Sequence, residues 1–198
     1  MARTRAADYD DKRQAILQRS AAVFAEHGVD RASMAQVAAE CGVSKALLYH
    51  YYDSKEALLQ DIIRSHLEEL DAAVAEADDP ALPPERRLRR LIGRVLECYR
   101  DADDLHQVQI IGMRTLPADR AEELKALERR IVGRFGAVLQ AVNPALVSGR
   151  PLLKPVTMSL FGMLNWVYMW FRPDGGLTRE EYADLATTLI LEGVRAVR

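Results

Sequence analysis

Residues 33–55 read SMAQVAAECGVSKALLYHYYDSK, and this stretch decides the fold. Ser33 and Ser44 each carry a hydroxyl that can cap the first turn of a helix. Gly42 can adopt the left-handed conformation that ends a helix, and Val43 is apolar where a turn between two packed helices needs an inward side chain. The pattern predicts two short helices, residues 33–41 and 44–51, around a tight turn.

The second of these helices has an inner and an outer face. Leu48 and Tyr52 lie four residues apart and share the inner face. Lysine, tyrosine and histidine side chains on the rest of the helix can contact phosphates, and the first residues of such a helix can reach base edges in the major groove. The arrangement predicts a helix-turn-helix that binds DNA. The same turn also occurs in helical bundles that never meet DNA.

The run Gly42-Val43-Ser44-Lys45-x-x-Leu-Tyr-x-x-aromatic-x-Ser-Lys-Glu56 resembles the TetR (tetracycline repressor) family of bacterial transcriptional regulators, over roughly residues 10–58. Ala46 departs from the pattern, because many members have glycine there. The resemblance implies that Lys45, Ala46 and Leu47 face base edges of double-stranded operator DNA. The full set of DNA-binding residues that it implies is Ser33, Ser44, Lys45, Ala46, Leu47, Tyr49, His50, Tyr51 and Lys55.

The composition of the chain favours a globular protein with a real core. Of its 198 residues 49% are hydrophobic, and the net charge is −2. Residues up to Lys55 carry a small excess of basic side chains, and the remainder is negative, which suits a small DNA-binding part. We find no signal peptide, and the longest apolar run, residues 156–171, is too short to span a membrane. Cys41 and Cys98 are expected as buried thiols in a cytoplasmic protein without membrane contact.

Helical periodicity and breaking residues divide the chain into nine predicted helices, the number that the resemblance also implies. The fold class is all-α, with a helix-turn-helix domain at residues 1–53 and a ligand-binding and dimerisation domain at residues 54–198. Residues 1–8 are expected as a solvated arm, the alternative being insertion into the minor groove. A long helix over residues 54–78 is predicted to link the domains as the one element that reaches both. The other predicted helices are 9–27, 33–41, 44–51, 85–100, 103–114, 118–142, 151–171 and 178–197.

The predicted helix 151–171 is apolar nearly all round, so a single core-facing stripe does not account for it. TetR-like proteins dimerise through their last two long helices. The resemblance therefore implies a homodimer through residues 151–171 and 178–197, with Leu189 and Val194 on its face. A central core helix in a monomer is the alternative.

The same helix and the turn after it resemble a subgroup of the family that senses acyl-CoA thioesters. Methionine and aromatic side chains suit an acyl group, Asn165 suits a thioester carbonyl, and arginines suit CoA phosphates. For each residue alone, ordinary packing or a surface ion pair is the competing interpretation. The predicted ligand-binding set is Tyr99, Met113, Arg114, Phe161, Asn165, Trp166, Trp170 and Arg172.

Enzyme activity is not expected. The sequence has no glycine-rich phosphate loop, no His-Glu-x-x-His and no nucleophile elbow, and we expect neither a metal site nor a cofactor. The predicted function is a repressor that releases a palindromic operator on binding an acyl-CoA such as phenylacetyl-CoA. The alternatives are a sensor of hydrophobic drugs or metabolites that controls efflux, and an interaction adaptor that does not bind DNA.

Overall fold

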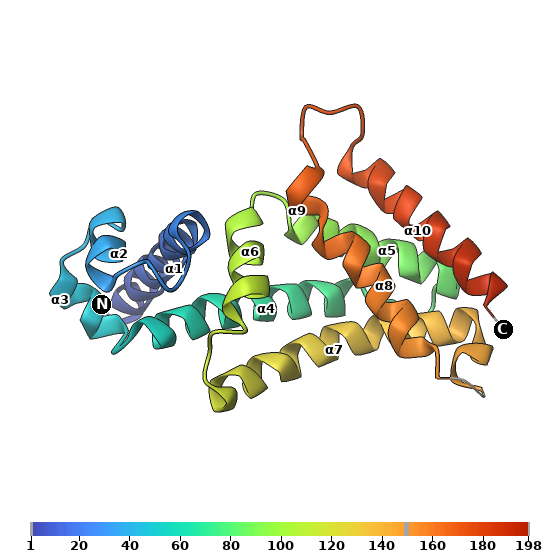
Figure 1. Cartoon of the computed structure of the whole chain (residues 1–198), viewed down its shortest axis with the longest axis horizontal. Helices are drawn as coiled ribbons and strands as arrows, with labels where there is room; N and C mark the ends of the chain where they lie inside the picture. Colours follow the sequence, from blue (N-terminus) through green and yellow to red (C-terminus); the bar gives the residue numbers. More distant parts are fainter. Residues whose placement is uncertain (1, 149–150, 198) are drawn as a thin grey trace. The chain divides into compact units, whose positions relative to one another are not determined.

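The computed structural model describes the backbone of residues 2–148 and 151–197, with all their side chains except those of residues 2–8 and 10. Every regular element in this part of the chain is a helix, which confirms the predicted all-α class (Figure 1). The chain forms two compact units. The first comprises Met1–Leu67 and Ala102–Lys125, and the second comprises Glu68–Asp101 and Ala126–Arg198.

The first unit contains α1 (Ala2–His27), α2 (Met34–Glu40), α3 (Lys45–Tyr51), most of α4 (Lys55–Ala77) and α6 (Asp103–Gly112). α1 packs against both α2 and α6, and α2 packs against α3. The Gln107 side chain of α6 donates to the Ala25 carbonyl of α1 at 3.4 Å. A Cβ at Gly112 would lie 2.9 Å from Leu59 Cδ1, so α6 approaches α4 closely at its end. α6 is therefore built into the unit that carries the helix-turn-helix.

The predicted start of the first helix at residue 9 is wrong, because α1 begins at Ala2. The solvation of residues 1–8 remains a prediction, since their side chains lie outside the described part of the chain. The sequence before Gly28 has no proline or glycine, and alanine and arginine are good helix formers. The Tyr9 ring also stacks on the Tyr51 ring with centroids 4.8 Å apart, which ties this part of α1 to α3.

The second unit contains α5 (Pro84–Cys98), most of α7 (Ala118–Val142), a 3₁₀ helix (Pro144–Val147), α8 (Leu153–Asn165), α9 (Val167–Trp170) and α10 (Arg179–Ala196). α5, α8 and α10 pack against one another (Figure 1). The apolar side chains that follow helical spacing on α5 and α7 are buried. On α10 the apolar side chains divide into two sets, because Ile190 and Val194 are buried whereas Leu185 and Leu189 are exposed.

The predicted helix 151–171 is interrupted. α8 ends at Asn165, Trp166 has ψ near −3°, and α9 is a single turn, so the nine predicted helices appear with this one divided into two. The Asn165 side chain accepts a hydrogen bond from the Tyr99 hydroxyl at 3.0 Å, and asparagine, valine and aromatic residues are weaker helix formers than leucine or alanine. Residues 166–171, four of which are aromatic, therefore do not continue the helical spacing of α8.

Two helices are shared between the units. α4 passes from the first unit to the second after Leu67, and α7 does so after Lys125. The prediction that one helix links the two predicted domains remains a prediction, because α7 lies entirely within the predicted second domain, residues 54–198. The predicted domain boundary at residue 53 remains a prediction, and the compact units group residues 102–125 with the helix-turn-helix.

Candidate nucleic-acid interface and effector site

Both helices of the helix-turn-helix, α2 and α3, have a serine cap at their N-terminus. Ser33 Oγ accepts from the Gln36 amide at 3.2 Å, and Ser44 Oγ accepts from the Leu47 amide at 3.1 Å. Gly42 has φ of +67°, and the amides of Gly42 and Val43 donate to carbonyls of the last turn of α2. This pair of bonds is a Schellman motif, which fixes the direction in which α3 leaves the turn.

The outer face of α3 is open. Leu48 is fully buried, whereas Lys45, Ala46, Leu47, Tyr49 and His50 are exposed. Lys45 Nζ lies 5.7 Å from the centroid of the Tyr49 ring, a cation–π distance that keeps the ammonium on this face. The predicted base-facing and phosphate-facing residues of α3 therefore share one exposed surface, apart from Tyr51, which is half-buried against Tyr9.

A partly buried polar network holds α3 in place. The Tyr52 hydroxyl donates to Asp61 Oδ2 at 2.7 Å, and Arg13 donates to both oxygens of the same carboxylate, at 2.9 and 2.6 Å. Burial and the bond to Asp61 raise the pKa of Tyr52, so its hydroxyl stays a donor. The Asp61 bond also raises the pKa of Arg13. Sequence reasoning placed Tyr52 on the inner face but missed Arg13 and Asp61, because no local spacing connects α1 with α4.

The Lys55 ammonium is bound within the chain and does not extend freely towards DNA. Its ammonium donates to the carbonyls of Val29, Asp30 and Ala32, at 2.6, 3.1 and 3.1 Å. An ammonium has three donors, so all of them are used within the chain. The geometry therefore supports a role in fixing the turn between α1 and α2, and the predicted phosphate contact has no support here.

Six of the eight predicted ligand-binding residues lie in the second unit, in different surroundings. Tyr99 is buried and bonded to Asn165, and burial raises its pKa. Phe161 is buried against Phe135, with ring centroids 5.0 Å apart. Trp170 meets the Tyr182 ring at 5.0 Å, whereas Trp166 is 56% exposed and Arg172 lies in the exposed turn before α10.

The other two predicted residues, Met113 and Arg114, belong to the first unit. Met113 is half-buried at the end of α6, and Arg114 is exposed in the turn that follows. The predicted set is thus divided between the units, and its role in ligand binding remains a prediction.

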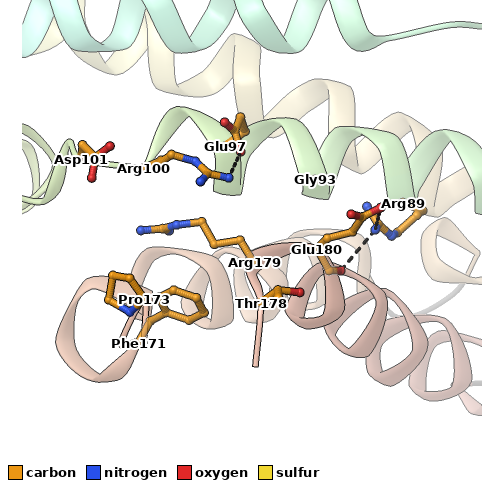
Figure 2. Close-up of a pocket in the computed structure, with 10 residues that line it drawn as sticks. All are labelled: Arg89, Gly93, Glu97, Arg100, Asp101, Phe171, Pro173, Thr178, Arg179 and Glu180. Carbon is orange, nitrogen blue, oxygen red and sulfur yellow. Dashed lines mark hydrogen bonds and ion pairs between the residues drawn. The ribbon is translucent and has the colours of Figure 1, made fainter. Parts of the chain in front are cut away.

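The second unit has a pocket that the predicted set does not line. It encloses about 580 Å³ between α5 and the segment that joins α9 to α10 (Figure 2). The sequence signal for it is the arginine-rich sequence of α5, a segment that was predicted only to be a helix. The lining residues include three arginines and an aromatic ring, namely Arg89, Arg100, Arg179 and Phe171.

Two family models match the chain. Residues 16–62 match bacterial regulatory proteins of the tetR family, and residues 81–194, more than half of the chain, match the tetracyclin repressor-like C-terminal domain. The chain belongs to the TetR family. This TetR-family member is therefore a DNA-binding transcriptional regulator, and α2 and α3 form its helix-turn-helix.

Individual relatives agree over nearly the whole length. The transcriptional repressor KstR2 of Mycobacterium tuberculosis (strain ATCC 25618 / H37Rv) is 25% identical, with 96% of each chain covered. A TetR-family transcriptional regulator from Bordetella parapertussis 12822 is 32% identical, with a TM-score of 0.85 over 94% of this chain and 97% of that one. AibR, solved in complex with isovaleryl coenzyme A and operator DNA, is 25% identical, with a TM-score of 0.76 over 90% of this chain and 97% of that one. These likenesses confirm the predicted TetR-like architecture.

Among residues 2–148 and 151–197, no helix combines the length and the apolar character needed to cross a bilayer. Within the same residues, no three His, Cys, Asp or Glu side chains are grouped so that they could hold a metal ion. Both cysteines are free thiols, Cys41 buried and Cys98 half-buried, and burial raises the pKa of each.

Proposed function

We propose that this TetR-family regulator is a homodimeric repressor that releases a palindromic operator when an acyl-CoA thioester binds its second unit. The observation that carries the proposal is the likeness to AibR, because AibR was solved with both isovaleryl coenzyme A and operator DNA. The likeness extends over both units of this chain. A short branched acyl thioester is therefore a better first choice of effector than the aromatic phenylacetyl thioester.

The DNA side of the proposal rests on the exposed face of α3. Lys45, Ala46 and Leu47 lie at its start, where a recognition helix meets base edges. Leu47 is 39% exposed and offers an apolar contact to a thymine methyl group. Tyr49, His50 and the N-cap residues Ser33 and Ser44 then contact the DNA phosphates on either side of the groove.

The dimer rests on an exposed apolar face on α8 and α10. Met158 and Trp166 on α8 and Leu185 and Leu189 on α10 are each about half exposed, and they follow helical spacing along adjacent helices. Gly162 and Gly193 lie on the same helices, and a Cβ on either would meet no atom of the described chain within 4 Å. A glycine inside a helix costs about 1 kcal/mol relative to alanine, and close approach of a second subunit gives a reason for it.

A two-fold dimer binds a palindromic site with half-sites about 34–36 Å apart or a multiple of that. α4 runs continuously from the first unit into the second, and α7 continues from the second unit into residues 118–125, which follow α6, the helix that packs on α1. A ligand that shifts the second unit therefore has one covalent route to the helix-turn-helix, through α4, and one route through packing, by way of α7 and α6. Such a ligand changes DNA affinity only by its differential affinity for the two states. A hundredfold preference corresponds to about 2.7 kcal/mol for each coupled site.

The experiment is release of bound promoter DNA, followed by fluorescence anisotropy. Isovaleryl-CoA, phenylacetyl-CoA, the two free acids, CoA alone and a hydrophobic drug are compared at equal concentration. Release by a thioester and not by its free acid supports the proposal. If only free acids or drugs release the DNA, the proposal of a thioester effector is rejected, and the result favours a sensor of hydrophobic drugs or metabolites.

A further inference from the structure

We infer that the pocket between α5 and the α9–α10 segment binds the phosphate-bearing adenosine end of a CoA-type ligand. This inference rests on the proposed function and names the part of the effector that the pocket recognises. A free adenine nucleotide has the same chemistry, so the experiment separates the two sources. All residues that line this pocket belong to the second unit.

Two guanidinium groups enter this pocket from facing sides. Arg100 reaches in from the turn after α5, and Arg179 reaches in from the first turn of α10 (Figure 2). Arg100 is paired with Glu97 at 2.8 Å. Among the described residues, no carboxylate oxygen lies within 4.0 Å of the Arg179 guanidinium, which instead faces the Leu96 carbonyl at 3.4 Å. Two arginines that share a cavity, one of them without a carboxylate, are suited to an anion between them.

The pocket also has a flat aromatic wall. The Arg179 guanidinium lies 4.8 Å from the centroid of the Phe171 ring, so the two planar groups form a layered surface. Pro173 continues this wall (Figure 2). A guanidinium held over a ring in this way can stack a heteroaromatic base as well as pair with a phosphate. One end of the ligand is therefore an aromatic base close to a phosphate.

The acidic residues of the pocket narrow the ligand class further. Glu97, Asp101 and Glu180 line it together with the arginines, so the site is not simply basic. A plain inorganic anion would meet both attraction and repulsion here. A nucleotide offers phosphates to the guanidiniums and donates from its amino and hydroxyl groups to the carboxylates. The pocket volume of about 580 Å³ lies within the usual range of about 300–1,000 Å³ for small-molecule sites.

The groove continues along α5 beyond this pocket. A neighbouring depression of about 470 Å³ shares Arg89, Gly93 and Glu97 with it. This depression adds Arg90 and Arg94, together with Glu76 and Ala77. A Cβ at Gly93 would lie 2.7 Å from a terminal nitrogen of Arg89, so the glycine lets the Arg89 side chain lie across the helix between the two spaces. The additional arginines give the phosphates of an extended ligand a second set of partners.

The experiment measures binding to the full chain by isothermal titration calorimetry. The probes are isovaleryl-CoA, CoA, ADP and the N-acetylcysteamine thioester of isovaleric acid, which lacks the nucleotide. The variants are Arg100→Gln and Arg179→Gln, and the control is Arg195→Gln, a half-exposed arginine near the other end of α10. We expect each pocket variant to weaken CoA and isovaleryl-CoA about tenfold or more, and the control to leave both unchanged. ADP should be weakened in the same variants.

The outcomes separate this inference from the proposed function. If binding of ADP and CoA requires Arg100 and Arg179 but no thioester releases the operator, the pocket assignment is supported. The proposal that a thioester is the effector is then rejected. The opposite result is that isovaleryl-CoA binds the unmutated protein and both variants equally tightly and releases the operator from all three. The effector assignment is then supported, and the pocket assignment is overturned. The assignment is also overturned if the truncated thioester binds as tightly as isovaleryl-CoA. Thermal unfolding of each variant shows whether the fold is retained, and Arg179→Lys, which keeps the charge without the planar group, tests the stacked layer with a folded protein.

Discussion

The Tyr52 hydroxyl donates to Asp61 at 2.7 Å, so the residue that follows the recognition helix is fixed to α4 by a hydrogen bond. Arg13 on α1 binds the same carboxylate. The direction of α3 is therefore set by a polar network as well as by the capped turn. The network lies beneath the proposed DNA-binding face, which allows stability and DNA contact to be separated by mutation.

Tyr52→Phe and Tyr49→Phe form a matched pair of hydroxyl deletions. Tyr52→Phe should lower the free energy of unfolding by about 1–2 kcal/mol, because a buried hydrogen bond to a carboxylate is lost. Tyr49→Phe removes an exposed hydroxyl and should leave stability within about 0.5 kcal/mol while weakening DNA binding. Urea unfolding and operator titration measure the two quantities. Equal stability losses in both variants would show that the network does not hold α3.

Lys45→Ala tests the assignment of base contacts. Lys45 is exposed at the start of α3, so its loss should weaken specific binding by about 1–3 kcal/mol and relax the choice of sequence. Binding to random DNA should fall less than binding to the operator. Anisotropy titrations with both DNAs at one fixed salt concentration measure the difference. An equal loss of affinity for operator and random DNA would show that Lys45 does not contact base edges.

Lys55→Ala distinguishes the predicted phosphate contact from the contacts that the structure contains. Its ammonium binds three carbonyls of the turn between α1 and α2, so its removal should lower the melting temperature of the free protein. The dependence of log affinity on log salt should keep its slope. A phosphate contact would instead leave the melting temperature unchanged and make that slope shallower by about 0.9.

Local patterns predicted the elements whose causes are local. The caps at Ser33 and Ser44 and the left-handed Gly42 all occur as predicted, since each involves residues within a few positions. The apolar periodicity of α5 and α7 likewise predicted their buried faces.

Features that depend on distant partners were missed or misplaced. The bond from Tyr99 accompanies the break at Asn165, and the stacking of Tyr9 on Tyr51 accompanies the longer α1. The pocket requires Arg100 and Arg179, which are far apart in sequence, so no spacing rule could join them. The resemblance to the family implied Val194 on the dimer face, but Val194 is buried within the chain, on a helix that packs against α5.

Leu189→Glu tests the proposed dimer. Leu189 is 56% exposed, so a carboxylate there is solvated in a monomer but would be buried in a dimer interface. The variant should remain helical, sediment as a monomer and lose operator binding. Gln140→Glu adds a charge on an exposed position of α7 and should change none of these properties. The dimer proposal fails if the unmutated protein itself sediments as a monomer. Val194→Glu is unsuitable for this test, because a buried charge would unfold the chain.

The last prediction concerns the pH dependence of folding, which the buried histidine pair of the first unit should influence. His66 on α4 and His106 on α6 are almost fully buried, and their ring centroids are 6.0 Å apart. Burial, with a smaller effect of His106, lowers the pKa of His66 from 6.5 to about 4. Between these pH values the unfolded chain binds a proton that the folded chain does not bind. The contribution of His66 to the free energy of unfolding is therefore fully present above about pH 6.5. It decreases as the pH falls towards 4, by on the order of 3 kcal/mol in total.

His66→Phe should flatten this part of the pH profile. The phenyl ring fills a similar space and does not titrate, so the decrease in unfolding free energy between pH 6.5 and 4.5 should be smaller than in the unmutated protein, whatever the variant's stability at pH 7.5. His50→Gln removes an exposed histidine and should keep the original profile. Urea unfolding at intervals of half a pH unit gives the comparison. If His66→Phe and the unmutated protein lose stability in parallel, protonation of His66 is not coupled to unfolding, and other groups cause the acid sensitivity.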